Sequence, residues 1–95
     1  MHKSLITVAA IFATLPAFAA ERLAEFSVPG MNCASCPFIV EAAMGKVDGV
    51  LEVTTDIEAR TASVRFDDAL TTAAIIAKAS ADAGYAATLS EEEAR

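Results

Sequence analysis

Hydrophobic and polar residues alternate one by one in three stretches of the chain. In residues 22–28, Ala24, Phe26 and Val28 fall on one side, while Glu25 and Ser27 fall on the other. A period of two is typical of a strand with one buried face. The pattern recurs at 50–58 and 61–67, and the short link around residues 58–60 predicts that these two strands form a hairpin. Their expected inner faces are Val53, Thr55 and Ile57, and Ala62, Val64 and Phe66.

Two other stretches space their apolar residues as a helix does. The first predicted helix covers residues 36–47, with Val40, Ala43, Met44 and Val47 on its inner side. Pro37 suits its first turn, where no N–H group is needed.

The second predicted helix follows Thr71 or Thr72, either of which can cap its start. Gly84 is placed to end this helix in a left-handed conformation. We expect its inner stripe to be Ile75, Ile76, Ala79 and Ala83.

Residues 85–89 predict a short last strand, and the glutamates at 91–93 predict a solvated tail. The order of elements is then strand, helix, strand, strand, helix, strand. This order is that of the ferredoxin-like βαββαβ fold in the α+β class. It places two helices on one face of a four-stranded antiparallel sheet.

The first nineteen residues differ in pattern from all that follows. They have one lysine, an apolar run from Leu5 to Leu15, Pro16, and then Ala17-Phe18-Ala19. These are the parts of a secretory signal peptide, and the apolar run is too short for a membrane span, which needs about 20 residues. We expect cleavage after Ala19 and a single domain over residues 20–95, without stable membrane insertion.

Charge narrows the range of partners once this leader is set aside. Six basic and thirteen acidic residues remain, a net charge of −7, and no histidine is left because His2 lies in the leader. A domain this acidic repels nucleic acid, so we expect no nucleic-acid partner. The chain has no serine–histidine pairing, P-loop or GxGxxG motif, and we do not expect an enzyme.

The remaining chemistry lies in the segment "GMNCASCP" at residues 30–37, which holds both cysteines of the chain. A structural disulfide between Cys33 and Cys36 would close too small a loop to stabilise the fold much. A redox-active dithiol has this spacing at a helix start, but the chain lacks the flanking Trp and Gly-Pro of thioredoxins. Zinc would need four ligands, and only two cysteines are available. A two-thiolate site for a soft ion such as Hg(II) or Cu(I) is favoured.

Such a site works by ligand exchange. Two protein ligands leave the ion open to an incoming third thiolate, so the ion can pass to a partner without being released. We expect a reduced dithiol in which the helix start lowers the pKa of Cys36 and the flexible Cys33 is released first.

The motifs "GMNCASC", "DGV", "VRFDD" and "DAGY" follow one another at intervals that resemble the heavy-metal-associated domain family, over residues 25–89. The resemblance implies the βαββαβ fold and a metal loop that binds through Cys33 and Cys36. It also implies that Met31 packs inward or serves as a third ligand. Tyr85 is expected to shield the metal loop or to fill the space between helix and sheet.

Within this family the chain looks most like the exported mercuric-ion-binding members of mercury-resistance systems, through "SVPGM", Cys36-Pro37, "FDD" and "ADAGY". That likeness implies a monomeric periplasmic carrier. It would take one Hg(II) on Cys33 and Cys36 and pass it to a membrane mercuric transporter. A Cu(I) chaperone of the same fold is the alternative, since both ions favour the same ligands.

Overall fold

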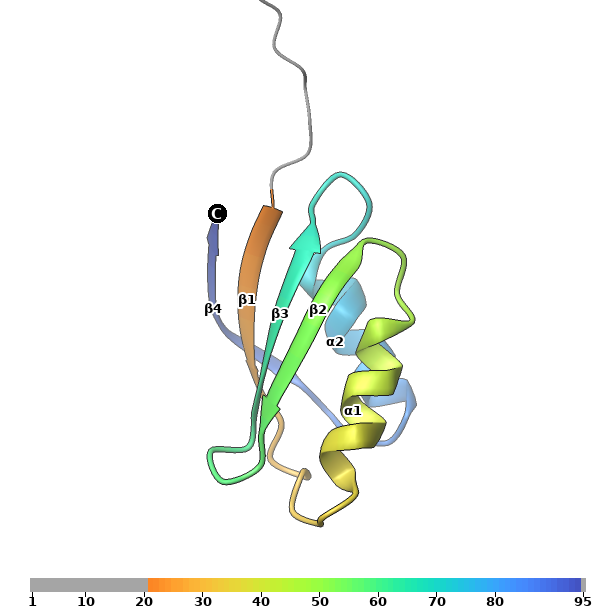
Figure 1. Cartoon of the computed structure of the whole chain (residues 1–95), viewed down its shortest axis with the longest axis vertical. Coiled ribbons are helices and arrows are strands. Elements are labelled where there is room, and N and C mark those ends of the chain that lie inside the picture. The colour runs from red at the N-terminus through yellow and green to blue at the C-terminus, as the bar shows by residue number, and fades with distance from the viewer. Residues whose placement is uncertain (1–20, 95) are drawn as a thin grey trace, which may run out of the picture.

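The computed structural model describes residues 21–94, so the expected leader and its cleavage site lie outside the described part. The elements are β1 Glu21–Ser27, α1 Cys36–Gly45, β2 Val50–Asp56, β3 Thr61–Asp67, α2 Ala73–Asp82 and β4 Thr88–Ala94 (Figure 1). No helix within these residues is long and apolar enough to cross a bilayer.

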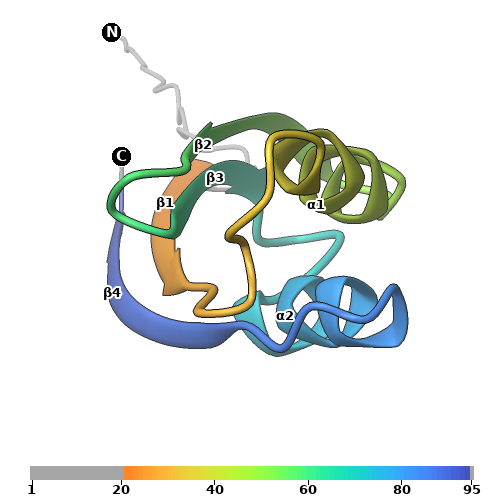
Figure 2. The ribbon, with the colours of Figure 1, turned by 90° about the horizontal axis from the view of Figure 1, so that it is seen from below.

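The strands form one antiparallel sheet in the order β2-β3-β1-β4. Both helices cover the same face of that sheet and leave the other face open (Figure 2). The predicted ferredoxin-like βαββαβ fold is therefore confirmed. In this topology β1 is a central strand, and the loop that follows it emerges between the helices and the hairpin of β2 and β3 (Figure 1).

The core lies between the sheet and the helices, and it is made by the alternating residues that the pattern predicted. Ala24, Phe26 and Val28 are fully buried, as are the inward residues of β3, Ala62, Val64 and Phe66. From the helices, Val40, Met44 and Ile76 complete it. The half-buried positions of β2 pack at its margin.

The inner stripe of α2 differs from the predicted one. Ala73, Ile76 and Ser80 are buried, whereas Ile75 is about half exposed and Ala83 lies beyond the helix and is exposed. Two adjacent isoleucines cannot share a face, because successive helical residues are about 100° apart. Thr72, one of the two expected caps, accepts a hydrogen bond from the Ile75 N–H at 3.2 Å.

Two predicted elements end early. Strand β2 ends at Asp56, whose carboxylate accepts from the N–H groups of Glu58 and Ala59 and so starts the turn. Ile57 consequently lies in the turn and is partly exposed, not on the inner face. Helix α1 ends at Gly45, two residues before the expected end.

The predicted last strand exists, but it lies later in the chain than the expected residues 85–89. Residues 85–87 are a link, and β4 runs from Thr88 to Ala94, so the expected solvated tail is part of the sheet. Glu91, Glu92 and Glu93 pair with β1 opposite Glu25, Ala24 and Leu23. An edge strand can carry charge because its ladder bonds are made by the backbone, and its side chains meet solvent.

Candidate metal centre

The loop between β1 and α1 carries both cysteines and is held by short backbone hydrogen bonds. The Met31 N–H donates to Val28 O at 3.0 Å, and the Cys36 N–H donates to Cys33 O at 3.1 Å. The Val28 N–H donates to Arg60 O at 2.8 Å, which fixes the start of the loop to the β2–β3 turn. The loop between β1 and α1 lies at one end of the molecule (Figure 1).

The two cysteines have different surroundings. Cys33 is exposed in the loop, whereas Cys36 is the first residue of α1 and only 3% exposed. Their sulfur atoms are joined as a disulfide. The pair is therefore oxidised here, in contrast to the reduced dithiol that we expected, because the loop brings the two sulfurs into bonding contact. The pair takes up an ion only after reduction, since a disulfide supplies no thiolate.

Tyr85 follows α2 in the chain and contacts this loop. Its hydroxyl donates to Cys36 Sγ at 3.2 Å, and its half-buried ring packs against the core. A side chain at Gly30 would meet the ring at 3.7 Å, so the aromatic ring and the loop backbone are close neighbours. Tyr85 thus both fills space beside the sheet and contacts one of the sulfurs.

The end of α2 determines where Tyr85 stands. Gly84 has a φ of +103°, and its N–H donates to Ala81 O while the Tyr85 N–H donates to Ser80 O, each at 2.9 Å. This pair of bonds is the Schellman motif of a helix end. The buried Ser80 hydroxyl donates in turn to Tyr85 O at 2.7 Å. The sequence predicted the role of Gly84 but not that of Ser80, which only the sequence Ser-x3-Gly-Tyr could have suggested.

Met31 is fully buried and belongs to the core. Its inward packing agrees with the first of its two expected roles. Within residues 21–94 no cluster of three or more His, Cys, Asp or Glu residues can hold a metal ion. In the described part of the chain, Cys33 and Cys36 are therefore left as a two-sulfur site.

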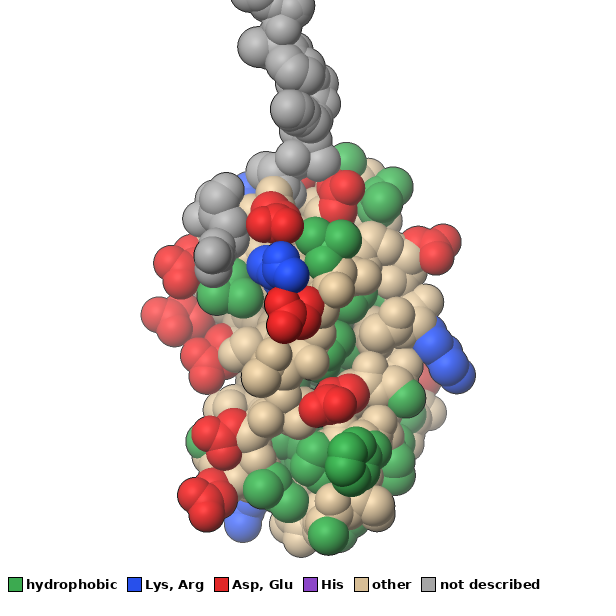
Figure 3. Space-filling model, in the orientation of Figure 1, with side chains coloured by type: hydrophobic (Ala, Val, Ile, Leu, Met, Phe, Trp, Pro, Cys, Tyr) green, Lys and Arg blue, Asp and Glu red, His purple; other side chains and the backbone are tan. Residues whose placement is uncertain are grey.

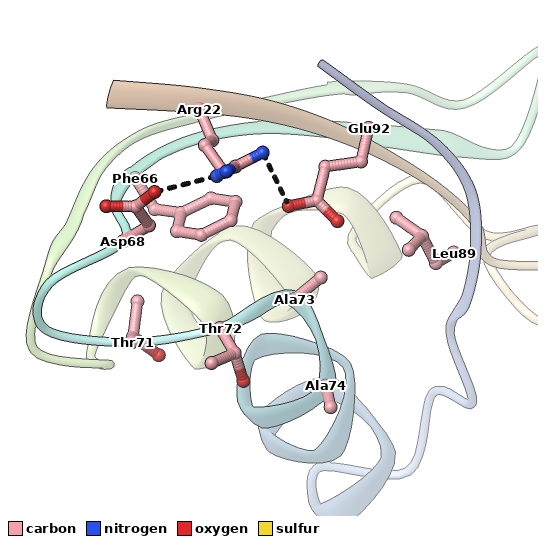
Figure 4. Close-up of a pocket in the computed structure, with 9 residues that line it drawn as sticks. All are labelled: Arg22, Phe66, Asp68, Thr71, Thr72, Ala73, Ala74, Leu89 and Glu92. Atoms are coloured by element: carbon pink, nitrogen blue, oxygen red, sulfur yellow. Dashed lines mark hydrogen bonds and ion pairs between the residues drawn. The ribbon is translucent and has the colours of Figure 1, made fainter. Parts of the chain in front are cut away.

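A separate hollow of about 670 Å³ lies where α2 begins (Figure 4). Arg22 crosses it and pairs with Asp68 at 2.7 Å and with Glu92 at 3.9 Å. The hydrogen bond to Asp68 raises the pKa of Arg22. The lining contains no sulfur or imidazole, and its charges pair with one another, so it offers no site for a soft ion.

Comparison with known proteins agrees with this geometry. The model of the heavy-metal-associated domain matches residues 25–86, nearly the whole described part. The chain belongs to the heavy-metal-associated domain family. A relative from Pseudomonas fluorescens, named mercuric transport protein periplasmic component, is 45% identical over 85 residues, covering 90% of this chain and 93% of its own length.

Solved structures of this family include members described with different metals. The crystal structure of oxidized MerP from Ralstonia metallidurans CH34 has a TM-score of 0.74 and 44% identity. The mercury-bound form of MerP has a TM-score of 0.68 and 42% identity. Each match covers 76% of this chain and 100% of the other. A copper-binding domain from HMA7, a P-type ATPase, has a TM-score of 0.73 and 36% identity, covering 76% of this chain and 97% of its own.

Proposed function

We propose that this protein is the periplasmic mercury-binding component of a mercuric transport system and acts as a carrier, not as an enzyme. The observation that supports this most directly is the isolated sulfur pair of Cys33 and Cys36, one exposed and one buried, at the start of α1. A soft ion accepts two thiolates as a sufficient ligand set. The names of the relatives point to mercury and to the periplasm.

In the proposed cycle, a dithiol reductant first opens the disulfide by thiol–disulfide exchange and is itself oxidised to a disulfide. The two thiolates of Cys33 and Cys36 then bind one Hg(II). A thiolate of the membrane mercuric transporter approaches the ion from the exposed side and forms a third bond. Cys33 leaves first because it stands in the exposed loop, while Cys36 is held by its place in α1 and by the Tyr85 hydroxyl. The ion passes on without being free in solution.

The proposal includes export of the domain. The leader at residues 1–19 would be removed after Ala19, and the domain would act in the periplasm as a monomer. The acidic surface of the domain argues against nucleic acid as a partner.

The test is a titration of the reduced protein with Hg(II) under argon, followed by ultraviolet absorbance and intact mass. We expect one ion per chain, retained against millimolar glutathione, and a loss of retention in both Cys33→Ser and Cys36→Ser. Ser90→Ala serves as the control, because this hydroxyl lies on β4 and donates to Glu25 O, outside the loop that carries the cysteines. Failure of the parent protein to retain Hg(II) would refute the proposal.

Cu(I) carriage is the second candidate, since the copper-binding domain of HMA7 has the same fold. Competition between Hg(II) and Cu(I) for the reduced protein, at matched buffering by a thiol, separates the two. Preferential retention of Cu(I) would favour a copper chaperone. Rapid reduction of insulin together with weak retention of both ions would instead favour a thiol–disulfide redox protein.

A further inference from the structure

The two sulfurs of the disulfide are not equally open to a thiolate in solution. Cys33 is exposed in the loop between β1 and α1, whereas Cys36 is only 3% exposed at the start of the helix. Thiol–disulfide exchange begins when a thiolate attacks one sulfur of the disulfide, and access helps to decide which sulfur that is. An incoming thiolate therefore reaches Cys33 Sγ more readily than Cys36 Sγ.

The surroundings of the loop also suit the approach of an anion. Residues 29–40 contain no charged side chain, although the domain as a whole is acidic. Figure 3 shows acidic side chains along the side formed by β4, while hydrophobic side chains gather over the lower part of the molecule, where α1 begins. Because like charges repel, an incoming thiolate meets less repulsion at the loop than beside β4.

The buried sulfur needs a hydrogen-bond donor if it is to leave as a thiolate, and the first turn of α1 does not supply one. The Cys36 N–H donates to Cys33 O at 3.1 Å, and Pro37 has no N–H. The next two N–H groups of the helix both donate to Ser35 O. Within residues 21–94, the donor that contacts Cys36 Sγ is the Tyr85 hydroxyl, at 3.2 Å.

The exposed sulfur has a different neighbour. Ser35 stands at the N-cap position of α1, but its hydroxyl makes no capping hydrogen bond. This hydroxyl lies instead 3.8 Å from Cys33 Sγ. Each sulfur thus faces one hydroxyl, so removal of either hydroxyl tests one of the two directions in which the disulfide can open.

We propose that a dithiol reductant opens the disulfide by attacking Cys33 Sγ, and that Tyr85 is the positioning residue that stabilises Cys36 Sγ as it leaves. The inference rests on the proposed function, in which the disulfide opens before an ion binds, and it adds the direction of that opening. Exposure selects the sulfur that is attacked. The hydrogen bond from Tyr85 stabilises the charge that develops on the other sulfur.

The step transfers one electron pair from the reductant to the protein. A thiolate of the reductant forms a bond to Cys33 Sγ, the bond between the two cysteines breaks, and Cys36 Sγ leaves with the electron pair as a thiolate. The second thiol of the reductant loses its proton to water and attacks the reductant sulfur of the mixed disulfide. Cys33 then leaves as a thiolate, and the reductant is oxidised to a disulfide.

Glutathione is a monothiol, so its first product with the protein is a mixed disulfide that shows which sulfur was attacked. The oxidised protein is mixed with excess glutathione, quenched with acid at short times and alkylated with N-ethylmaleimide, and fragmentation in the mass spectrometer locates both groups. We expect glutathione on Cys33 and maleimide on Cys36, about tenfold or more over the reverse pattern. Glutathione mainly on Cys36 would overturn the inference.

Two hydroxyl deletions test which sulfur leaves. In Tyr85→Phe, which keeps the ring, we expect the second-order rate of opening by glutathione to fall about tenfold, because hydrogen bonds to charged groups are the stronger ones. In Ser35→Ala we expect a rate within about twofold of the parent, because Cys33 is the attacked sulfur and not the one that leaves. Ser90→Ala is the control for removal of a hydroxyl outside the loop.

Three outcomes of these rates would overturn the inference. Slow opening in Ser35→Ala, with the parent rate in Tyr85→Phe, would show that Cys33 is the sulfur that leaves. Parent rates in both variants would remove the role of Tyr85. Glutathione on both sulfurs of Tyr85→Phe would show that the tyrosine only shields Cys36. No metal is present in these measurements, so each failure leaves the proposed function standing, which the Hg(II) titration of the reduced protein tests separately.

Discussion

The Tyr85 hydroxyl donates a hydrogen bond to Cys36 Sγ across 3.2 Å, which joins residues 49 positions apart in the chain. This bond connects the end of α2 to the start of α1, and it holds the less exposed of the two sulfurs. Tyr85 therefore acts on the sulfur site through this hydrogen bond as well as through the packing of its ring against the core.

Replacement of Tyr85 by Phe removes the hydroxyl and keeps the ring. We expect the free energy of unfolding to fall by about 1 kcal/mol, the usual net value of one hydrogen bond. We also expect Hg(II) affinity to fall by about tenfold, as is typical for loss of a group that orients a ligand. Urea unfolding and competition with a thiol buffer measure the two quantities. Unchanged affinity in the folded variant would limit Tyr85 to a structural role.

Differential alkylation of the reduced protein tests the asymmetry of the two cysteines. At high pH, where both are thiolates, iodoacetamide should modify Cys33 faster, because Cys33 is exposed and Cys36 is 3% exposed. As pH is lowered, Cys36 should keep its reactivity longer, because it stands at the N-terminus of α1. Peptide mapping by mass spectrometry follows both sites. A lower midpoint at Cys33 would contradict the proposed order of release.

The substitution Met31→Leu separates the two expected roles of Met31. Leucine preserves most of the volume, so we expect a loss of stability below about 1.5 kcal/mol. Because Met31 is fully buried in the core, we expect Hg(II) binding to remain at one ion per chain with the parent affinity. A large loss of affinity in a folded variant would identify the thioether as a third ligand.

Truncation after Ser90 tests whether the glutamates belong to the sheet. The cut removes the pairing of residues 91–94 with β1, and we expect a cost of about 2–3 kcal/mol from several backbone bonds worth about 1 kcal/mol each. The control is Glu91→Gln with Glu93→Gln, which removes charge and keeps the strand. It should match or exceed the stability of the parent, because Glu91 faces Glu25 across the ladder. If the truncation left the free energy of unfolding unchanged, residues 91–94 would be better described as the solvated tail that the sequence predicted.

The sequence allowed most of the fold to be predicted because β1, β3 and α1 each bury one regular face. Alternation in β1 and β3 left little choice about which residues point inward. The thiol pair could also be identified as the candidate site from the sequence, because the chain has no other cysteine. Its family followed from the motifs around it.

The errors lie where burial leaves no regular pattern. Every side chain described from Thr88 to Glu93 is exposed, so β4 has no apolar period to reveal it, and its strand exists through backbone pairing with β1. The adjacent Ile75 and Ile76 gave two possible phases for α2. Ser80 is buried because its hydroxyl reaches Tyr85 O, a contact that only the three-dimensional turn provides.

The glutamates of β4 have a consequence for behaviour at high concentration. A free strand edge is a template on which another chain can add a strand and begin to aggregate. Here Glu91 and Glu93 lie on one side of the edge strand, while Glu92 lies on the other and pairs with Arg22. Carboxylates on an edge strand disfavour the approach of the same edge of a second copy. We therefore expect the carboxylates of β4 to disfavour self-association through this edge.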